Sequence, residues 1–173
     1  MELKQYADSL IYRRRSIRKF TDEPVREEQL AHVLHAGMAG PSAHNMQPWS
    51  FAVIDERALL DAIADFHPYA KMMRQATMAV LVCIKKAVAA EDPFYQQDLG
   101  AAVQNMLLAA TEAGLGSCWC GIHPNEELEG AFVRLLNVPG DLRPFAVVAL
   151  GHPASETRSS DRFEASRVHR NAW

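Results

Sequence analysis

Apolar residues recur along the chain with helical spacing in several places. Spacings of three and four positions put side chains on one face of a helix and predict five helices. The five segments are residues 3–13, 26–37, the stretch that carries Leu59, Leu60 and Ile63, 98–113, and 126–136. Asp55 and Asn125 are expected to be the N-caps of the third and fifth helices. Gly37 and Gly114 are expected to mark the ends of the second and fourth.

Runs of consecutive apolar residues predict strands. The run Met-Ala-Val-Leu-Val-Cys-Ile at 78–84 contains no polar position, which is typical of a strand buried on both faces of a sheet. Residues 145–151 show the same pattern, and residues 51–54 and 117–121 are shorter extended pieces. Residues 87–96 are expected to form a surface loop.

Two segments are difficult to place inside a single subunit. The predicted helix 98–113 is apolar on nearly all sides, because Ala101 and Leu108 lie opposite its main apolar face. A helix of this kind is buried, and contact with a partner subunit is one way to bury it. Residues 152–173 are polar and include four arginines, yet they end in Trp173. Such a tail is either disordered or lies on another surface, and the tryptophan favours docking.

The composition is that of a soluble globular protein. The 173 residues are 49% hydrophobic and 23% charged, with a formal net charge of −3. This length favours one domain, residues 1–173, and the net charge argues against a nucleic-acid-binding protein. The cysteines are odd in number and no signal peptide is evident, which predicts a reducing, cytoplasmic location. No apolar run approaches the roughly 20 residues of a membrane span, so no membrane association is expected.

A cationic cluster lies near the start of the chain. Five of the eight residues in the stretch 13–20, Arg-Arg-Arg-Ser-Ile-Arg-Lys-Phe, are cationic, and Ser16 adds a hydroxyl. Arginine presents a planar fork of donors that matches phosphate oxygens. A solvated helix end and a nucleic-acid patch are the alternatives. On a slightly acidic protein, a local cationic pocket suits a small anionic ligand better than a polyanion.

Two further stretches could contact a ligand. The loop Pro-Ser-Ala-His-Asn-Met-Gln-Pro-Trp at 41–49 holds amide and hydroxyl side chains between two prolines, and such groups can bind a flat heteroaromatic ring. The stretch Gly-Leu-Gly-Ser-Cys-Trp-Cys-Gly at 114–121 allows close approach of the backbone to a ligand. It is not G-x-G-x-x-G and follows a predicted helix, which excludes the Rossmann interpretation.

Metal binding and thiol catalysis are not expected. His32 and His35 share a helix face, but no matching set of metal ligands accompanies them. Cys118 and Cys120 point to the same side of an extended segment, and packing is the favoured role for both, since nothing specifies a base or a cationic setting.

Taken together, the stretches at 14–20, 41–49 and 98–121 and the strand that ends in Gly-His-Pro at 151–153 resemble the FMN-dependent nitroreductase family, along nearly the whole chain. The resemblance implies an α+β fold, a three-layer α/β/α sandwich with a central mixed, mostly antiparallel sheet. It also implies a homodimer with two FMN molecules at the interface, the long apolar helix in the dimer core, and a C-terminal arm, 152–173, crossing onto the partner.

The resemblance also assigns roles to residues. The phosphate and ribityl end of FMN would be held by Arg14, Arg15, Ser16 and Arg18. From the other subunit, the flavin ring would be lined by Pro41, Ser42, Ala43 and Asn45, with help from Gln47. The backbone of Cys120 and Gly121 would lie near flavin N5. Arg162 of the arm, with Arg158 behind it, would complete the phosphate site. Where the family has a further ribityl or pyrimidine contact, Lys71 is the candidate of this chain.

The activity implied by the resemblance is that of an oxidoreductase that uses NADH or NADPH and bound FMN to reduce a small oxidised organic molecule, such as a nitroaromatic or quinone, in a ping-pong sequence. The flavin supplies the chemistry in such enzymes, so no catalytic side chain is expected. A dehalogenase or flavin-consuming enzyme of the same family is an alternative. Others are a non-catalytic FMN-binding protein and, from another class, a nucleic-acid module.

Overall fold

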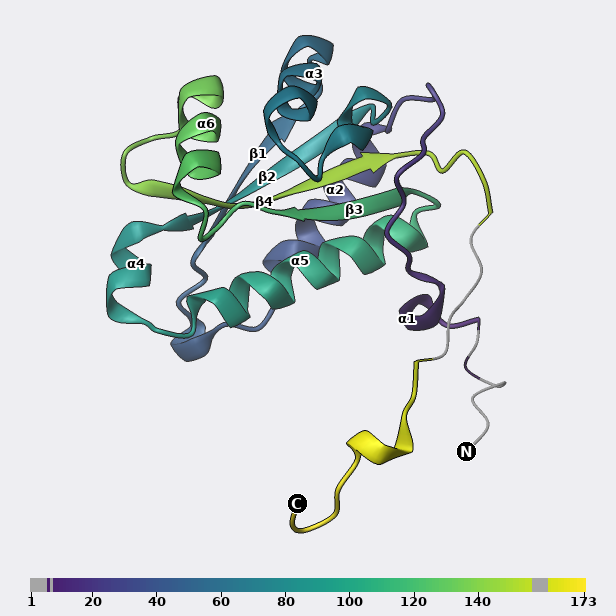
Figure 1. Ribbon diagram of the computed structural model, residues 1–173, viewed down its shortest axis with the longest axis vertical. Coiled ribbons are helices and arrows are strands. Elements are labelled where there is room, and N and C mark those ends of the chain that lie inside the picture. The colour runs from purple at the N-terminus through teal and green to yellow at the C-terminus, as the bar shows by residue number, and fades with distance from the viewer. Residues whose placement is uncertain (1–5, 7, 157–161) are drawn as a thin grey trace.

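A four-stranded antiparallel sheet forms the centre of the computed structural model, which describes residues 6, 8–156 and 162–173 (Figure 1). The strand order is β1-β2-β4-β3. The strands are β1 (Trp49–Ile54), β2 (Met78–Lys85), β3 (Gly116–Gly121) and β4 (Leu142–Gly151). A parallel bridge between Ser16 and Ser117 adds the N-terminal segment beside β3. With this bridge the sheet is mixed and mostly antiparallel, as the family resemblance implied.

Helices cover both faces of this sheet. Figure 1 shows α3 and α6 above the strands and α2 and α5 below them. The helices are α1 (Leu10–Arg13), α2 (Glu27–Met38), α3 (Arg57–Phe66), α4 (Lys86–Glu91), α5 (Tyr95–Glu112) and α6 (Glu126–Leu136), with 3-10 turns η2 (Ala43–Asn45), η3 (Lys71–Arg74) and η4 (Ala165–Arg167). Two hydrophobic clusters fill the spaces between these layers. The predicted α+β three-layer sandwich is confirmed.

Strand β2 shows why the run at 78–84 contains no polar residue. Leu81 and Cys83 pack into the cluster under α3 and α6, whereas Val80 and Val82 pack into the cluster against α2 and α5. Because alternate side chains point to opposite faces, a strand covered on both sides needs apolar residues at every position.

Helix α5 confirms the strongest helix prediction and begins three residues before residue 98. It ends before Gly114, whose φ of 76° suits the left-handed position that follows a helix. Leu99, Val103 and Met106 are fully buried, but Gln104 on the outer side is exposed. Within one chain, the outer side of α5 remains only partly covered.

The predicted ends of the other helices are right in part. Asn125 caps α6, since its Oδ1 accepts a hydrogen bond from the Leu128 N–H at 3.1 Å. Asp55 was the wrong cap, because α3 starts one residue later, after Glu56. Gly37 lies inside α2 and does not end it. A Cβ at Gly37 would lie 2.8 Å from Met106 Cγ, so this glycine permits close packing of α2 on α5.

Two further predictions from periodicity need correction. The helix expected over 3–13 is only the four-residue α1 in the described part of the segment, and Ile11 is exposed. The loop expected over 87–96 contains α4 and the start of α5. A single turn buries too little apolar surface to produce a clear pattern, and α4 has no buried residue, so local periodicity could not define either helix.

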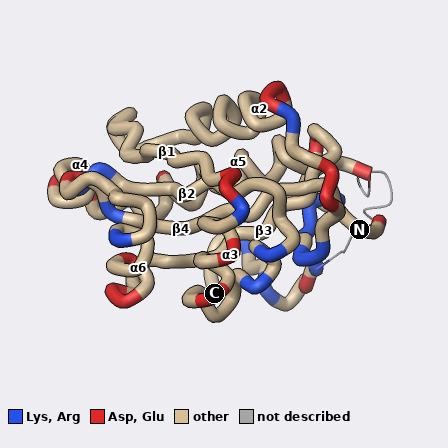
Figure 2. The backbone as a smooth tube through the Cα atoms, turned by 90° about the horizontal axis from the view of Figure 1, so that it is seen from above, with Lys and Arg blue, Asp and Glu red and all other residues tan. Residues whose placement is uncertain are grey.

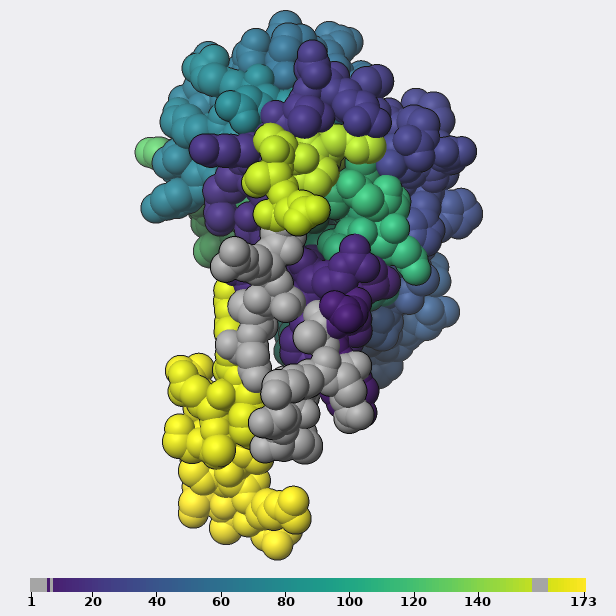
Figure 3. All heavy atoms as spheres, turned by 90° about the vertical axis from the view of Figure 1, so that its right-hand side faces the viewer, coloured from purple at the N-terminus to yellow at the C-terminus, as the bar shows by residue number. Residues whose placement is uncertain are grey.

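The chain after β4 falls into two parts. Residues 152–154 pair with the N-terminal segment, through a bridge between Phe20 and Pro153 and a hydrogen bond from the Thr21 N–H to the His152 carbonyl at 2.9 Å. Residues 162–173 are exposed throughout, and Figure 3 shows them in yellow, projecting from the rest of the molecule. Arg158 lies outside the described residues. Docking of the arm on a partner stays a prediction.

Among the described residues, no helix combines the length and the apolar character that crossing a bilayer requires.

Candidate functional site

The arginine-rich stretch is held along the edge of the sheet. The Ile17 N–H donates to the Ser117 carbonyl at 2.9 Å. A Cβ at Gly116 would lie 2.8 Å from the Ile17 side chain, so the absence of a side chain there allows the stretch to pack directly on β3. Arg14 and Arg15 are half-buried, and Ser16 and Arg18 are exposed. The backbone is fixed while the cationic heads remain near the surface.

A hollow of about 510 Å³ opens beside this stretch. Its lining residues come from the N-terminal stretch, from the segment around η3 and from β3: Arg18, Lys19, Pro68, Tyr69, Lys71, Met72, Gln75, Cys118 and Trp119. Three of them are cationic and none is acidic. Figure 2 shows a group of Lys and Arg positions in this part of the molecule. The volume is typical of a small-molecule site, and the charge favours an anionic ligand.

The cysteines of β3 differ in their ionisation. A hydrogen bond with the Cys120 thiol lowers the pKa of Cys118 to about 7, the charges of Arg18 and Arg14 act in the same direction, and burial opposes them. That hydrogen bond and burial raise the pKa of Cys120. Both side chains are buried, in keeping with packing. The sequence specified no cationic setting for Cys118, but the pairing of the N-terminal stretch with β3 brings Arg18 close to it.

Gly121, at the end of β3, faces open space and is held by a buried histidine. A Cβ at Gly121 would meet no atom within 4 Å. His67 Nε2 lies 3.0 Å from the Gly121 carbonyl oxygen, and the Tyr69 N–H donates to His67 Nδ1 at 3.2 Å. These two contacts select the neutral tautomer that carries hydrogen on Nε2. Burial lowers the pKa of His67, which further favours the neutral ring.

The loop at 41–47 has an unusual backbone. His44, Asn45 and Gln47 have φ values of 49°, 55° and 46°, in the left-handed region that non-glycine residues seldom occupy. The Gln47 N–H donates to Ser42 Oγ at 3.0 Å, and Gln47 Nε2 donates to Asn45 Oδ1 at 3.3 Å. Pro41, Asn45 and Gln47 are exposed. The loop therefore presents polar side chains from a fixed backbone.

A single chain does not bring the predicted phosphate-binding stretch and the predicted ring-binding loop together. The loop leads directly into β1, at one edge of the sheet, whereas the arginine stretch lies beside β3, at the other edge. Three strand spacings, roughly 14 Å, separate these edges. Arg162 is exposed in the projecting C-terminal segment. Arg18 and the β3 segment meet at the hollow, and Lys71 joins them there.

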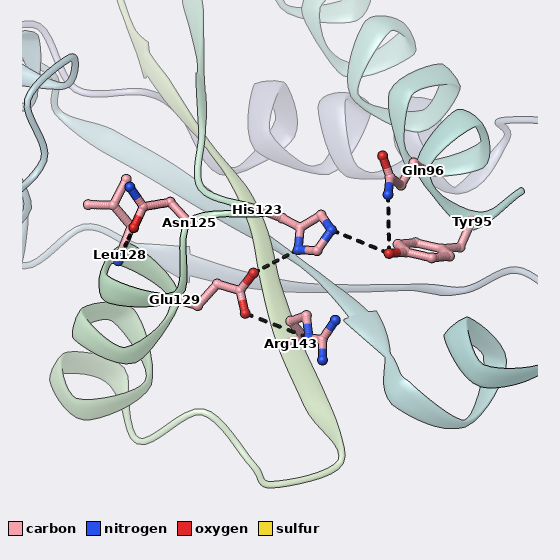
Figure 4. Close-up of polar contacts among 7 residues, drawn as sticks. All are labelled: Tyr95, Gln96, His123, Asn125, Leu128, Glu129 and Arg143. Atoms are coloured by element: carbon pink, nitrogen blue, oxygen red, sulfur yellow. Dashed lines mark hydrogen bonds and ion pairs between the residues drawn. The ribbon is translucent and has the colours of Figure 1, made fainter. Parts of the chain in front are cut away.

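A polar cluster near the end of β3 was missed from the sequence. His123 Nδ1 lies 2.7 Å from Glu129 Oε1, and His123 Nε2 lies 3.3 Å from the Tyr95 hydroxyl (Figure 4). The Glu129 carboxylate also pairs with Arg143, with Nε and Oε2 3.6 Å apart. These residues come from α5, α6, β4 and the segment after β3, so no local motif could indicate them. No group of three or more metal-ligating His, Cys, Asp or Glu side chains occurs in the described part of the chain.

The fold and these motifs match a known family. The model of the nitroreductase family matches residues 11–71 and 65–152 of this chain. The chain belongs to the nitroreductase family. A relative from Methanothermobacter thermautotrophicus, whose name pairs NADH dehydrogenase with NAD(P)H nitroreductase, is 40% identical over 160 residues, which are 92% of this chain and 84% of the relative.

Solved structures agree with this assignment to the nitroreductase family. A structure from Clostridium acetobutylicum, named as an NADH oxidase, is 34% identical, covers 95% of this chain and 100% of its own, and has a TM-score of 0.91. A Desulfovibrio desulfuricans structure, described as a nitroreductase in complex with FMN, is 36% identical, covers 95% of each chain and has a TM-score of 0.79.

Proposed function

We propose that this protein is an FMN-dependent oxidoreductase that uses NADH or NADPH to reduce a small oxidised organic molecule of the nitroaromatic or quinone type. Family membership supports the general activity. The observation that carries the proposal is the cationic hollow beside β3, where the nitroreductase-like arginine stretch, the segment around η3 and the β3 residues Cys118 and Trp119 come together. The open backbone at Gly121 follows two residues after Trp119 on the same strand.

The residues in and next to this hollow fit FMN, since Arg18 lines it and Arg14 and Arg15 precede Arg18 in the same stretch. Arg14, Arg15 and Arg18 can donate to a phosphate, whose charge at neutral pH is about −1.5 to −2. The hydroxyl of Ser117 is buried beside the same stretch and has no hydrogen-bond partner among the described residues, so it is a donor available to a ligand. Bound FMN would supply the hydride-transfer chemistry between NADH or NADPH and the oxidised substrate, which would react in a ping-pong sequence.

The residues around the ring would orient it and exclude water. Gly121 leaves space for close approach of a flat ring, and His67 fixes the direction of its carbonyl. We propose that the backbone of Cys120 and Gly121 lies near flavin N5. The cationic side chains of Arg18 and Lys71 would favour added negative charge on a ligand in the hollow.

A homodimer would complete this site. Within one chain, the ring-binding loop and the hollow lie on opposite flanks of α5. Asp98 contacts the loop, whereas Gly100 lies against Trp119 of the hollow. Residues two positions apart point about 200° apart around a helix. The outer side of α5, between these flanks, is only partly covered. A second copy that packs symmetrically there would bring its loop to the first copy's hollow.

The C-terminal arm would supply a further phosphate contact from the partner. Residues 162–173 are exposed and project from the body that they follow, and Trp173 is 100% exposed. We propose that Arg162 reaches the phosphate site once the arm lies on a second subunit. A cytoplasmic location stays a prediction.

An absorbance spectrum of the purified protein tests this function. Flavin bands near ~450 nm that bleach on anaerobic addition of NADH or NADPH would support it. A protein that binds FMN without bleaching would be a non-catalytic binder. Failure to take up added FMN would contradict the proposal. Turnover of nitroaromatic, quinone and halogenated substrates, with analysis of the flavin afterwards, separates the reductase from a dehalogenase or a flavin-consuming enzyme.

A further inference from the structure

The end of α2 and the loop that follows it lie along α5 in regular steps. Residues 37, 40 and 43 meet residues 106, 102 and 98 of the helix in turn. The loop side advances by three residues a step, and the helix side retreats by four, which is about one helical turn. The segment that leads to the predicted ring-binding residues is thus docked on α5 at three successive turns.

The first two steps are close contacts in which any side chain larger than that of glycine would require its neighbours to shift. A Cβ at Gly37 would lie 2.8 Å from Met106 Cγ, and a Cβ at Gly40 would lie 3.1 Å from the backbone nitrogen and Cα of Ala102. These contacts fix the path of the chain up to residue 40. They do not fix the loop beyond it.

The third step is polar. The Ala43 N–H donates to both carboxylate oxygens of Asp98, at 3.1 and 3.2 Å. Asp98 is only 6% exposed and lies in the first turn of α5, where the positive end of the helix dipole stabilises a negative charge. A buried carboxylate that receives a backbone N–H forms a stronger hydrogen bond than a neutral acceptor would.

The loop beyond this contact is strained. Its three non-glycine residues with positive φ each occupy a left-handed conformation that is unfavourable for an ordinary side chain. Strained backbone persists only where its surroundings determine it. The hydrogen bonds that Gln47 donates to Ser42 and Asn45 are internal to the loop, so they cannot fix its position relative to the helix.

We propose that Asp98 is a positioning residue for flavin binding: its carboxylate anchors the Ala43 N–H and so holds the loop at 41–47 in the single conformation that packs on the FMN ring of the partner subunit. This inference rests on the proposed function. Asp98 itself touches neither the flavin nor the substrate. It acts by raising the fraction of molecules whose loop is ready to bind.

The expected loss of FMN affinity follows from the fraction of molecules whose loop at 41–47 is ordered. A hydrogen bond to a charged group contributes about 1.5–3 kcal/mol, so loss of the Asp98 contact would lower the ratio of ordered to disordered loop about 10- to 150-fold. Because only the ordered fraction of the protein can bind, the apparent Kd for FMN rises as that fraction falls, by up to the same factor. Asp98→Asn keeps an acceptor oxygen, so its Kd should stay within about fivefold of the wild type.

The test compares Asp98→Ala and Asp98→Asn with Gln29→Ala. Gln29 is a matched control, because its Nε2 donates to the Ala113 carbonyl at 2.9 Å and joins α2 to the far end of α5, away from the loop. FMN titration by fluorescence quenching gives Kd, thermal unfolding gives the loss of stability, and hydrogen exchange of the FMN-free protein gives the protection of amides 42–47.

Asp98→Ala should weaken FMN binding and reduce the exchange protection of amides 42–47. Asp98→Asn should keep FMN affinity and this protection close to those of the wild type. Gln29→Ala should lower thermal stability but change neither FMN affinity nor the protection of amides 42–47. The inference is overturned if Asp98→Ala and Gln29→Ala lose stability similarly and both bind FMN as the wild type does. It is also overturned if amides 42–47 stay protected in Asp98→Ala. A wild-type protein that does not bind FMN would instead contradict the proposed function.

Discussion

The two edges of the sheet present ligand-binding groups in opposite ways. At the β1 edge, the loop at 41–47 is held by backbone contacts to α5 and has a strained, well-defined conformation. At the β3 edge, the stretch 13–20 has a fixed backbone, but its cationic side chains lie at or near the surface.

This difference fits the two ends of the proposed ligand. A flat ring is bound by groups that must already be in position, since a misplaced amide leaves a polar atom unpaired. A phosphate is bound by long cationic side chains that can adjust to it. The comparison predicts that changes at the β3 edge act through lost charge and contacts, and changes at the β1 edge act through lost order.

The largest effect is expected from the arginines. Arg14→Ala and Arg18→Ala should each remove a charge-assisted contact of about 1.5–3 kcal/mol and weaken FMN binding about 10- to 150-fold. Arg134→Ala, on the exposed side of α6, is the matched control. FMN titration that shows the same affinity for all three variants would remove the phosphate site from the β3 edge.

Substitution of two glycines of β3 should separate effects on stability from effects on FMN binding. In Gly116→Ala, the new methyl group would meet Ile17 at 2.8 Å, so overpacking should cost about 1–3 kcal/mol of stability and also displace the arginine stretch. In Gly121→Ala the methyl group meets nothing, so stability should hardly change while FMN binding weakens. Thermal unfolding and FMN titration measure the two effects, and unchanged FMN binding in Gly121→Ala would place the ring elsewhere.

A change away from both edges should affect stability alone. Asn125→Ala removes the cap of α6 and should lower the free energy of unfolding by about 1 kcal/mol, with FMN affinity unchanged. Urea denaturation gives the first value. If FMN binding fell as well, the two edges would not account for the site by themselves.

The smallest effect concerns a single proton on His67. Burial lowers its pKa in the folded protein below the ordinary 6.5, so the unfolded chain takes up that proton at a higher pH. Stability should be complete above pH 6.5 and should fall as the pH falls through the lower, folded pKa. His67→Gln should give a shallower loss of stability than the wild type below pH 6.5 in urea denaturation. Equal slopes would show that His67 does not carry this dependence.

Local signals account for what the sequence predicted correctly. The apolar run of β2, the apolar side of α5 and the Asn125 cap depend on neighbours within a few positions, and the structure confirms all three. The arginine stretch was also visible, because its charge is concentrated in eight residues. Family resemblance added the order of the motifs, which no single stretch provides.

Contacts between distant segments account for what the sequence did not reveal. Asp98 is one polar residue in a helix until the fold brings Ala43 to it, 55 positions away. His67 lies in a segment without periodicity and acts on Gly121, 54 positions later. The pKa of Cys118 is lowered mainly by its hydrogen bond with Cys120, and Arg18 and Arg14 from the distant N-terminal stretch add to this effect. Such pairs are set by topology, so no local pattern predicts them.

A mixed dimer tests whether each FMN site combines the β3 edge of one subunit with the β1 edge of its partner. One subunit carries Arg18→Ala, the other carries Asn45→Ala with Gln47→Ala, and two affinity tags isolate the heterodimer after co-expression. Shared sites predict one fully wild-type site in each mixed dimer, because both defects then fall in the other site. FMN titration should therefore find one molecule per heterodimer bound with wild-type affinity, and neither homodimer should show such a site. A heterodimer without a wild-type site would show that each subunit builds its site alone and would contradict the account.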